Sequence, residues 1–179
     1  MKRALTILLI VACVWFVGVA TAGTAMQGTK VEVKRAAQVA FDRLRSGDYV
    51  ALYEALPSTS QRRIPRARFI AALERVRGMY QLDRLQVGGV AVEGDGAAID
   101  TTIYGRVREP VQGEGKIEVR QYLEREGGSW RVITDDASAV RRLLAKHPKL
   151  ARRFPVRPPR VFVKRDASWV ELTPNRARR

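Results

Sequence analysis

The chain has 179 residues and a formal net charge of +15, and 46% of its residues are hydrophobic. Such a length accommodates one domain of ordinary size, and no internal repeat marks a solenoid. The only cysteine, Cys13, excludes an intramolecular disulfide and a metal site built on cysteines.

The N-terminus predicts a membrane segment. Lys2 and Arg3 precede an uncharged run, residues 4–26, with a dense apolar centre at 7–17. A run of this length spans the roughly 30 Å hydrocarbon core of a bilayer. We therefore expect a signal anchor that passes through the membrane with residues 4–26 and leaves the following domain on the extracytoplasmic side.

Alternatives to an uncleaved anchor stay open. Residues 20–22, Ala-Thr-Ala, form a small-x-small cleavage candidate, and cleavage near Ala22 would release a secreted protein. Residues 10–13 resemble a lipobox that ends at Cys13, although apolar residues follow instead of a polar linker. In the opposite topology the domain would face the cytoplasm.

Three amphipathic helices are predicted next, because apolar residues recur at three- to four-residue spacing. Ser46 and Gly47 end the first helix, Asp48 caps the second, and Pro57 closes it. A polar turn is expected at 58–61, before a proline in the first turn of the third helix. The expected helices cover residues 33–46, 49–56 and 65–78.

Four antiparallel strands follow, because the apolar period changes to two. Gly88 and Gly89 interrupt the first strand and predict a bulge or a bend. The second strand has one apolar and one polar face, and glycine-containing turns separate the strands. The expected strands cover residues 82–92, 97–107, 117–124 and 130–134.

The C-terminal part is strongly basic. Residues 141–179 carry 13 Lys and Arg against Asp166 and Glu171, whereas residues 27–140 are nearly balanced. A basic segment attracts an anionic surface, and a solvated extension without a partner is the alternative. The residues expected to contact an anionic surface are Arg141, Arg142, Lys146, Lys149, Arg152 and Arg153.

This segment also predicts local structure. A short helix over 139–144 stops near Pro148, and Arg157-Pro158-Pro159 forms a stiff extended link. A small hairpin of residues 161–163 and 169–172 is expected to dock on another surface, because an isolated hairpin is marginal in water.

The order of elements resembles the nuclear transport factor 2-like superfamily. The residues that carry the resemblance are Ser46-Gly47-Asp48-Tyr49, the helix entry at 64–69, Thr101 and Trp130-Arg131-Val132. Closest in pattern are the non-catalytic domain of class B penicillin-binding proteins and small membrane-anchored bacterial relatives. The resemblance covers about residues 31–136.

The resemblance implies an α+β fold in which three N-terminal helices pack on a curved four-stranded antiparallel sheet, a cystatin-like cone. Within the superfamily the cone pocket serves isomerases, hydratases, ligand binders and scaffolds. The chain has no Ser-x-x-Lys motif, so no acyl-transfer activity is carried over. The expected organisation is a signal segment at 1–28, the cone domain at 29–136 and the basic region at 137–179.

Three polar residues, Tyr53, Thr101 and Gln121, are candidates to line a cone pocket. Gln121 is the odd polar residue on an apolar strand face, and a buried polar group needs a partner. A glutamine satisfied within the core is the alternative.

No residue pattern specifies a reaction. His147, the only histidine, is expected on the surface outside the cone, and Asp100 lies on the polar strand face. Residues 135–136, Asp-Asp, fit a helix cap better than a metal site. The glycines lie in hairpin turns, which excludes a dinucleotide fingerprint, and no cofactor is expected.

The function that these observations favour is a membrane-anchored, envelope-exposed, non-catalytic binding or scaffolding module. Its expected partners are the membrane and another envelope protein or an anionic surface. A small-ligand binder or an enzyme that uses the cone pocket is the first alternative. Contact with nucleic acid through the basic segment is the second and less favoured one, because aromatic residues are not interleaved with the basic ones.

Overall fold

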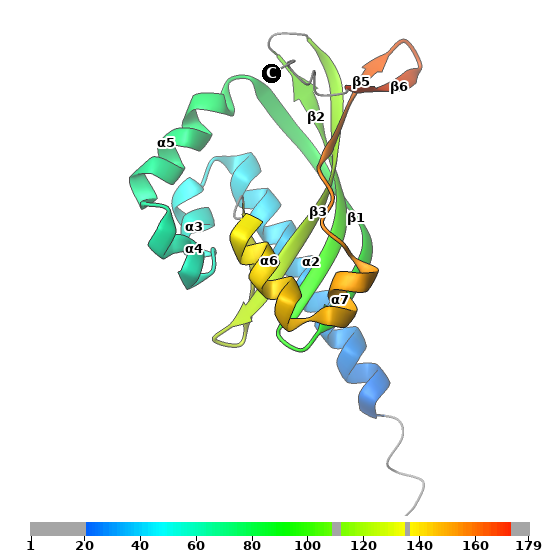
Figure 1. The fold of residues 1–179 in the computed structure, drawn as a ribbon. Helices are drawn as coiled ribbons and strands as arrows, with labels where there is room; N and C mark the ends of the chain where they lie inside the picture. The colour runs from blue at the N-terminus through cyan, green and yellow to red at the C-terminus, as the bar shows by residue number, and fades with distance from the viewer. Residues whose placement is uncertain (1–20, 109–111, 135–136, 173–179) are drawn as a thin grey trace, which may run out of the picture.

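The computed structural model describes residues 21–108, 112–134 and 137–172 (Figure 1). The apolar run that was expected to enter the membrane lies mostly outside these residues. Within the described part of the chain, no helix is both long and apolar enough to cross a membrane.

The first described helix, α2, covers Thr21–Ser46, so it begins well before the amphipathic pattern does. It ends where the sequence predicts, because Gly47 has a left-handed φ of 80°. The Oδ1 atom of Asp48 then accepts a hydrogen bond of 3.1 Å from the Ala51 amide and caps α3, Tyr49–Glu54.

The expected polar turn at 58–61 is instead a helix, α4, over Ser58–Arg63. Gln61 explains the difference, because its side-chain amide donates to the carbonyl oxygens of Tyr53, Glu54 and Leu56. These bonds satisfy the C-terminal carbonyls of α3 from within the next helical turn. The third predicted helix is α5, Arg66–Arg77, with Pro65 directly before it and Gly78 after it.

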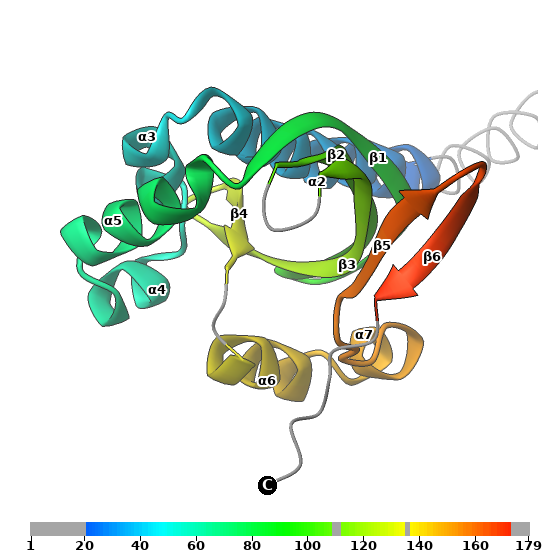
Figure 2. The ribbon, with the colours of Figure 1, turned by 90° about the horizontal axis from the view of Figure 1, so that it is seen from above.

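The sheet is antiparallel throughout and wraps around α2 (Figures 1 and 2). A meander of β1, β2 and β3 forms its centre. The expected four strands are present, and two more extend the sheet. The strands are β1 Tyr80–Glu93, β2 Gly96–Val107, β3 Gly113–Glu126, β4 Ser129–Ile133, β5 Arg160–Arg165 and β6 Ser168–Leu172.

One edge of β3 is shared between two strands. Its C-terminal half pairs with β4, and residues 115–118 pair with β5, which carries β6. The expected C-terminal hairpin therefore docks by joining the sheet itself, so the sheet has six strands instead of four. Pairing with β3 supplies the third strand that a marginal hairpin lacks.

The register of β1 is irregular at Gly88 and Gly89, where the sequence predicts a bulge or a bend. Pairing with β2 shifts between Val87 and Val90. A Cβ atom at Gly88 would lie 3.3 Å from the Asp100 carbonyl oxygen, and one at Gly89 would lie 3.5 Å from the Phe154 ring. A second shift, between Leu82 and Arg84, had no signal in the sequence.

Helices cover both faces of the sheet (Figure 2). On the concave face, Val33 and Ala37 of α2 pack in a cluster with Ile99 and Leu123. On the outer face, α6 (Ala137–Lys146) and α7 (Pro148–Arg153) pack against the sheet. The outer cluster contains Ala91, Ala98, Tyr122, Ile133, Ala139, Leu143, Leu150 and Phe154.

One expectation for this region is corrected and another is extended. The sequence predicted one apolar and one polar face for β2, but residues 96–99 are all buried. Both faces are covered there because α7 packs on the side opposite α2. The expected helix ends near Pro148 as predicted, since α6 ends at Lys146, but the sequence analysis missed the second helix, α7, which begins at Pro148 because a proline is well tolerated in a first helical turn.

His147 was expected on the surface and is instead buried, with 7% of its surface exposed. It joins α6 to α7 and packs on the β1–β2 turn. Its Nε2 atom lies 2.9 Å from the Asp95 Oδ1 atom, an ion-pair distance without hydrogen-bond alignment. Glu93 accepts a hydrogen bond from the Leu150 amide. The β1–β2 turn region therefore contacts the start of α7 at two points, through Asp95 at His147 and through Glu93 at Leu150.

Gly96 has no room for a side chain, because an added Cβ atom would lie 2.4 Å from the His147 ring. We expect Gly96→Ala to lower the free energy of unfolding by about 1–3 kcal/mol, measured by urea denaturation. The matched control is Gly113→Ala, where a Cβ atom would meet nothing within 4 Å.

The cause of the loss can be tested in a double-mutant cycle. We expect Gly96→Ala to cost much less in a His147→Ala background, because the clashing ring is gone. Equal losses in both backgrounds would contradict a steric origin.

Candidate functional site

Helix α5 stands away from the sheet (Figure 1). None of its residues is buried, although Phe69, Ile70, Leu73 and Val76 form an apolar face that is only half exposed. Between this face, α2 and the sheet lies a cavity of about 540 Å³, which we name the cone cavity. An amphipathic helix usually buries its apolar face, so the space under α5 is a candidate ligand site.

The cone cavity is lined mainly by apolar side chains from α2, α3, α5 and the concave face of the sheet. Two buried polar atoms in its wall, Gln121 Oε1 and Thr134 Oγ1, have no hydrogen-bond partner among the residues that the structure describes. Two exposed arginines, Arg63 and Arg68, complete the polar lining. The remaining lining residues are Ala40, Phe41, Leu44, Leu52, Ile64, Phe69, Ala72, Leu73, Ile103 and Val132.

The sequence candidates for a cone pocket are separated by the structure. Gln121 lies in the cavity wall, whereas Tyr53 and Thr101 are not among the lining residues. The Tyr53 hydroxyl is 2.9 Å from two carbonyl oxygens, those of Gln61 and Ile64, so it fastens α4 to α3. Thr101 is 3% exposed, and its hydroxyl donates to the Val119 carbonyl at 3.1 Å.

Thr134 was not singled out from the sequence. It directly follows β4, and no local pattern distinguishes it from a polar residue at a strand end. Arg63 and Arg68 were not singled out either. The sequence nevertheless contained one indication of the cavity, the apolar face of α5, because such a face usually packs against another surface.

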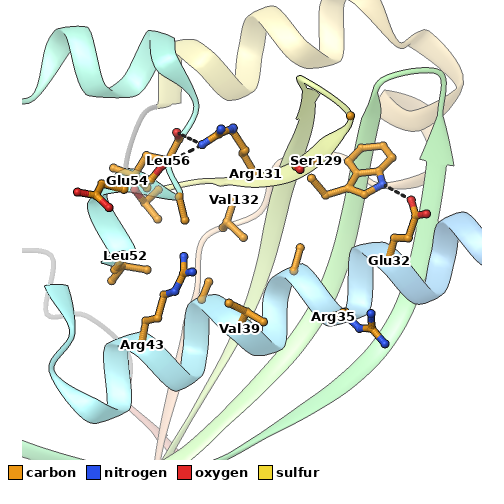
Figure 3. Close-up of a pocket in the computed structure, with 16 residues that line it drawn as sticks. Glu32, Arg35, Val39, Arg43, Leu52, Glu54, Leu56, Ser129, Arg131 and Val132 are labelled. Carbon is orange, nitrogen blue, oxygen red and sulfur yellow. Dashed lines mark hydrogen bonds between the residues drawn. The ribbon is translucent and has the colours of Figure 1, made fainter. Parts of the chain in front are cut away.

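A second hollow lies on the other side of α2, between this helix and β4 (Figure 3). It measures about 500 Å³ and shares Ala40, Leu52, Val132 and Thr134 with the cone cavity. Its polar residues are mostly satisfied within the protein. The Trp130 ring donates to Glu32 at 3.3 Å, and Arg131 donates to the carbonyl oxygens of Glu54 and Leu56.

These bonds give the second hollow a structural role. Figure 3 shows Arg131 of β4 reaching to the end of α3. The hydrogen bond from the Trp130 ring joins the same strand to Glu32 of α2. The contacts tie the sheet edge to both helices. Unpartnered atoms do not separate the two hollows, because Arg131 Nε and the shared Thr134 Oγ1 in the second hollow also lack a hydrogen-bond partner among the described residues. We prefer the cone cavity as the ligand site because apolar side chains form most of its wall and it lies under the half-exposed apolar face of α5.

The chemistry available in the cone cavity is limited. Its lining contains no Asp, Glu, His, Cys, Ser or Tyr, so the described wall offers no side chain typical of a general base. Among the described residues, no group of three His, Cys, Asp or Glu side chains is placed to hold a metal ion. Apolar contact and hydrogen bonding are what this wall supplies.

Asp100 lies on the outer face, away from the cone cavity. It accepts hydrogen bonds from Arg120 at 2.8 and 3.1 Å and from Arg157 at 2.8 Å. The hydrogen bonds that Arg120 donates to Asp100 raise the pKa of Arg120, whereas burial acts to lower it. Arg120 also donates to the Pro155 carbonyl at 2.9 Å, so the cluster fixes the chain between α7 and β5 on the sheet.

The six basic residues singled out from the sequence are all exposed on α6 and α7. The same helices bury Leu143 and Leu150 against the sheet. The basic residues therefore form one outward face of an ordered layer. We name the part at the α6–α7 junction, Lys146, Lys149, Arg152 and Arg153, the basic end face.

Sequence comparisons find no relative of this chain, whereas several solved structures resemble its fold. The sequence matches no known protein family, and no curated protein matches it. Among solved structures, the chain is similar to a putative dehydratase of the nuclear transport factor 2-like family from Streptomyces avermitilis, at 12% identity and a TM-score of 0.45. The match covers 59% of this chain and 91% of that one.

Two other solved structures match over a larger share of the chain. One is a nuclear transport factor 2-like protein with a cystatin-like fold from Novosphingobium aromaticivorans, at 19% identity, 71% and 98% coverage and a TM-score of 0.43. The other is an epoxide hydrolase from M. tuberculosis, at 16% identity, 70% and 94% coverage and a TM-score of 0.40. The superfamily named from the sequence thus recurs here as a likeness of fold, and likeness this distant carries no argument about activity.

The outer-face ion pair gives a testable consequence. We expect Asp100→Asn to lower the free energy of unfolding by about 1–3 kcal/mol, because it leaves the largely buried Arg120 guanidinium without its counter-charge. Thermal and urea denaturation measure the loss. The control is Glu171→Gln, which removes the exposed partner of Arg160 and should change stability much less. Equal losses would contradict the special role of Asp100.

Proposed function

We propose that the chain is a membrane-anchored, envelope-exposed binding module that takes a small, mainly apolar ligand in the cone cavity. The observation that carries this proposal is the cavity of about 540 Å³ whose wall combines apolar side chains with two unpartnered oxygen atoms. Ligand sites in proteins are typically hollows of roughly 300–1,000 Å³ with few, well-placed polar groups.

The polar atoms favour a particular kind of ligand. The Gln121 Oε1 atom is a pure acceptor, and the Thr134 oxygen accepts as well as donates. A buried acceptor without a partner is costly, so a ligand that brings an O–H or N–H group to this wall gains affinity. The preferred ligand is therefore an apolar molecule with a hydrogen-bond donor.

Binding is favoured over catalysis by the composition of the wall. A hydrolase or an isomerase needs a group that moves protons, and the described lining has no carboxylate or imidazole. A scaffold without a ligand would have no use for an open cavity beside a half-exposed apolar helix face.

The anchor is proposed from the sequence. Residues 4–26 are uncharged, and α2 carries the chain without a break from Thr21 into the core. In this arrangement the domain stands close to the membrane, on a continuous helix.

Binding can be tested with the fluorescent probe 1-anilinonaphthalene-8-sulfonate. We expect saturable binding by the full chain in detergent, weakened several-fold by Ala72→Phe, which fills the cavity from α5. The matched control is Ala71→Phe, which changes the neighbouring exposed position outside the lining and should leave binding unchanged. Equal effects of both variants, or no saturable binding, would sink the proposal.

The role of Gln121 is tested by displacing the probe with 1-decanol and with its methyl ether, which lacks the donor. We expect Gln121→Leu to weaken displacement by decanol about 5–10-fold, the worth of one hydrogen bond of 1–1.4 kcal/mol, with little effect on the ether. A uniform loss for both molecules would show that the variant damaged the cavity instead of one bond.

The anchor is tested by fusing a periplasmic reporter after Arg179 and by measuring the mature mass against the full 20.1 kDa. We expect an active reporter in the membrane fraction at full mass. A soluble, shortened product would instead indicate cleavage near Ala22, and an inactive reporter would refute export.

A further inference from the structure

We propose that the basic end face of α6 and α7 docks on the anionic phospholipid headgroups of the membrane that holds the N-terminal segment. The proposal rests on the anchor proposed above and is independent of the ligand in the cone cavity. It assigns the partner of an interaction surface that the fold builds from the C-terminal region.

The first support is the charge of these helices. Residues 137–157 contain seven Lys and Arg and no Asp or Glu. Lys146, Lys149 and Arg152 form no ion pair or hydrogen bond with described residues, and Arg153 only lies near the Phe154 ring. The face is therefore a set of cations whose charge is not neutralised within the described protein.

The nearest acids do not cancel this charge. Glu93 accepts a hydrogen bond of 2.6 Å from the Leu150 amide, and Asp95 faces His147. The Glu93 carboxylate is thus turned to the inner side of the α6–α7 junction, whereas the Asp95 side chain is 54% exposed, and neither forms an ion pair with the four cations among the described residues. The cations point outward, since all four are exposed while Leu143 and Leu150 are buried beneath them.

The second support is position. His147 packs on the β1–β2 turn from the outer side. On the concave side, Val33 of α2 packs with Val92 and Ala97, which flank the same turn. The basic end face and the N-terminal half of α2 therefore meet at one end of the sheet (Figure 1).

That end is close to the expected membrane segment. Val33 lies about 10 Å along the helix axis from Met26, the last residue of the uncharged run, at 1.5 Å per residue. Attraction between exposed charges extends over a Debye length of roughly 8 Å in physiological salt. This end of the sheet is thus the part of the sheet nearest to the expected membrane segment along α2, and cations placed there face the headgroup region, where Lys and Arg bind anionic lipid.

The rigidity of the layer adds a consequence. His147 and Glu93 hold the α6–α7 junction on the β1–β2 turn. The Asp100–Arg120 pair holds the segment after α7 through the Pro155 carbonyl. Docking of the basic end face would therefore fix the tilt of the whole sheet, where an anchor alone leaves the domain free to swing.

The test uses the full chain in vesicles, with Cys13→Ser and Ala145→Cys to place one bimane label on exposed α6. Headgroup spin-labelled phosphatidylcholine quenches the label when α6 lies at the surface. We expect at least twofold stronger quenching in vesicles with one part in three phosphatidylglycerol than in phosphatidylcholine alone, and loss of this difference at high salt.

The charge-removed variant changes Lys146, Lys149, Arg152 and Arg153 to Gln and should abolish the lipid dependence. The matched control removes four exposed arginines away from the basic end face, Arg75 of α5 and Arg106, Arg108 and Arg165 at the opposite end of the sheet, and should keep the lipid dependence. Circular dichroism checks that both variants retain the fold.

Quenching that is independent of lipid charge, or that both variants lower equally, would overturn the docking while leaving the anchor intact. A bimane response to double-stranded DNA but not to anionic lipid would overturn it in favour of nucleic acid. A chain that does not float with vesicles would refute the anchor and the docking together, whereas probe binding in the cone cavity would be unaffected.

Discussion

The structure depends on the burial of both faces of one β-hairpin. Near the β1–β2 turn, Ala97 and Ile99 face α2, and Ala98 and its strand neighbour Tyr122 face α6 and α7. Small side chains at Ala91, Ala97 and Ala98 let helices approach from both sides. This end is packed in three layers, so α2, the sheet and the basic helices form one body. Burial of the apolar surface between the layers is the main contribution to its stability.

The opposite end of the molecule is packed differently, and the cone cavity follows from that difference. There α5 has no buried residue, and it packs mainly against α3, with less contact to the sheet, which it meets at β1. A cone that is closed tightly at one end and loosely at the other leaves an open space where the helices splay. Local openings of low stability are where ligand sites are commonly found. The unpartnered oxygen atoms of Gln121 and Thr134 lie in that space.

Electrostatics reinforce the layered end. Asp100 binds two arginines on the outer face and steers the chain from α7 to β5, where it joins the free half of the β3 edge. The edge would otherwise expose unpaired backbone groups, which proteins tend to cover. Because β5 pairs with β3, the basic region is an ordered part of the domain, and its exposed cations lie on the outer face of α6 and α7.

The sequence by itself determined much of the secondary structure. Helix ends at Gly47 and Gly78, the cap at Asp48, the four-strand meander, the β1 bulge and the C-terminal hairpin all followed from local chemistry, because caps, turns and periodicity act over a few residues. Gln121 was also recognisable as a polar residue on an apolar face. The notion of a cone with a pocket came from the resemblance.

Only the tertiary structure decided what those elements face. Whether His147 is buried, whether residues 96–99 are covered on both sides, and whether Thr101 or Thr134 borders the cavity depend on contacts between segments far apart in the chain. Local patterns carry no information about such pairings, since the same polar residue suits a surface, a satisfied core site or a cavity wall. The space under α5 exists because α5 packs more on α3 than on the sheet, and that arrangement is set by the packing of the whole domain.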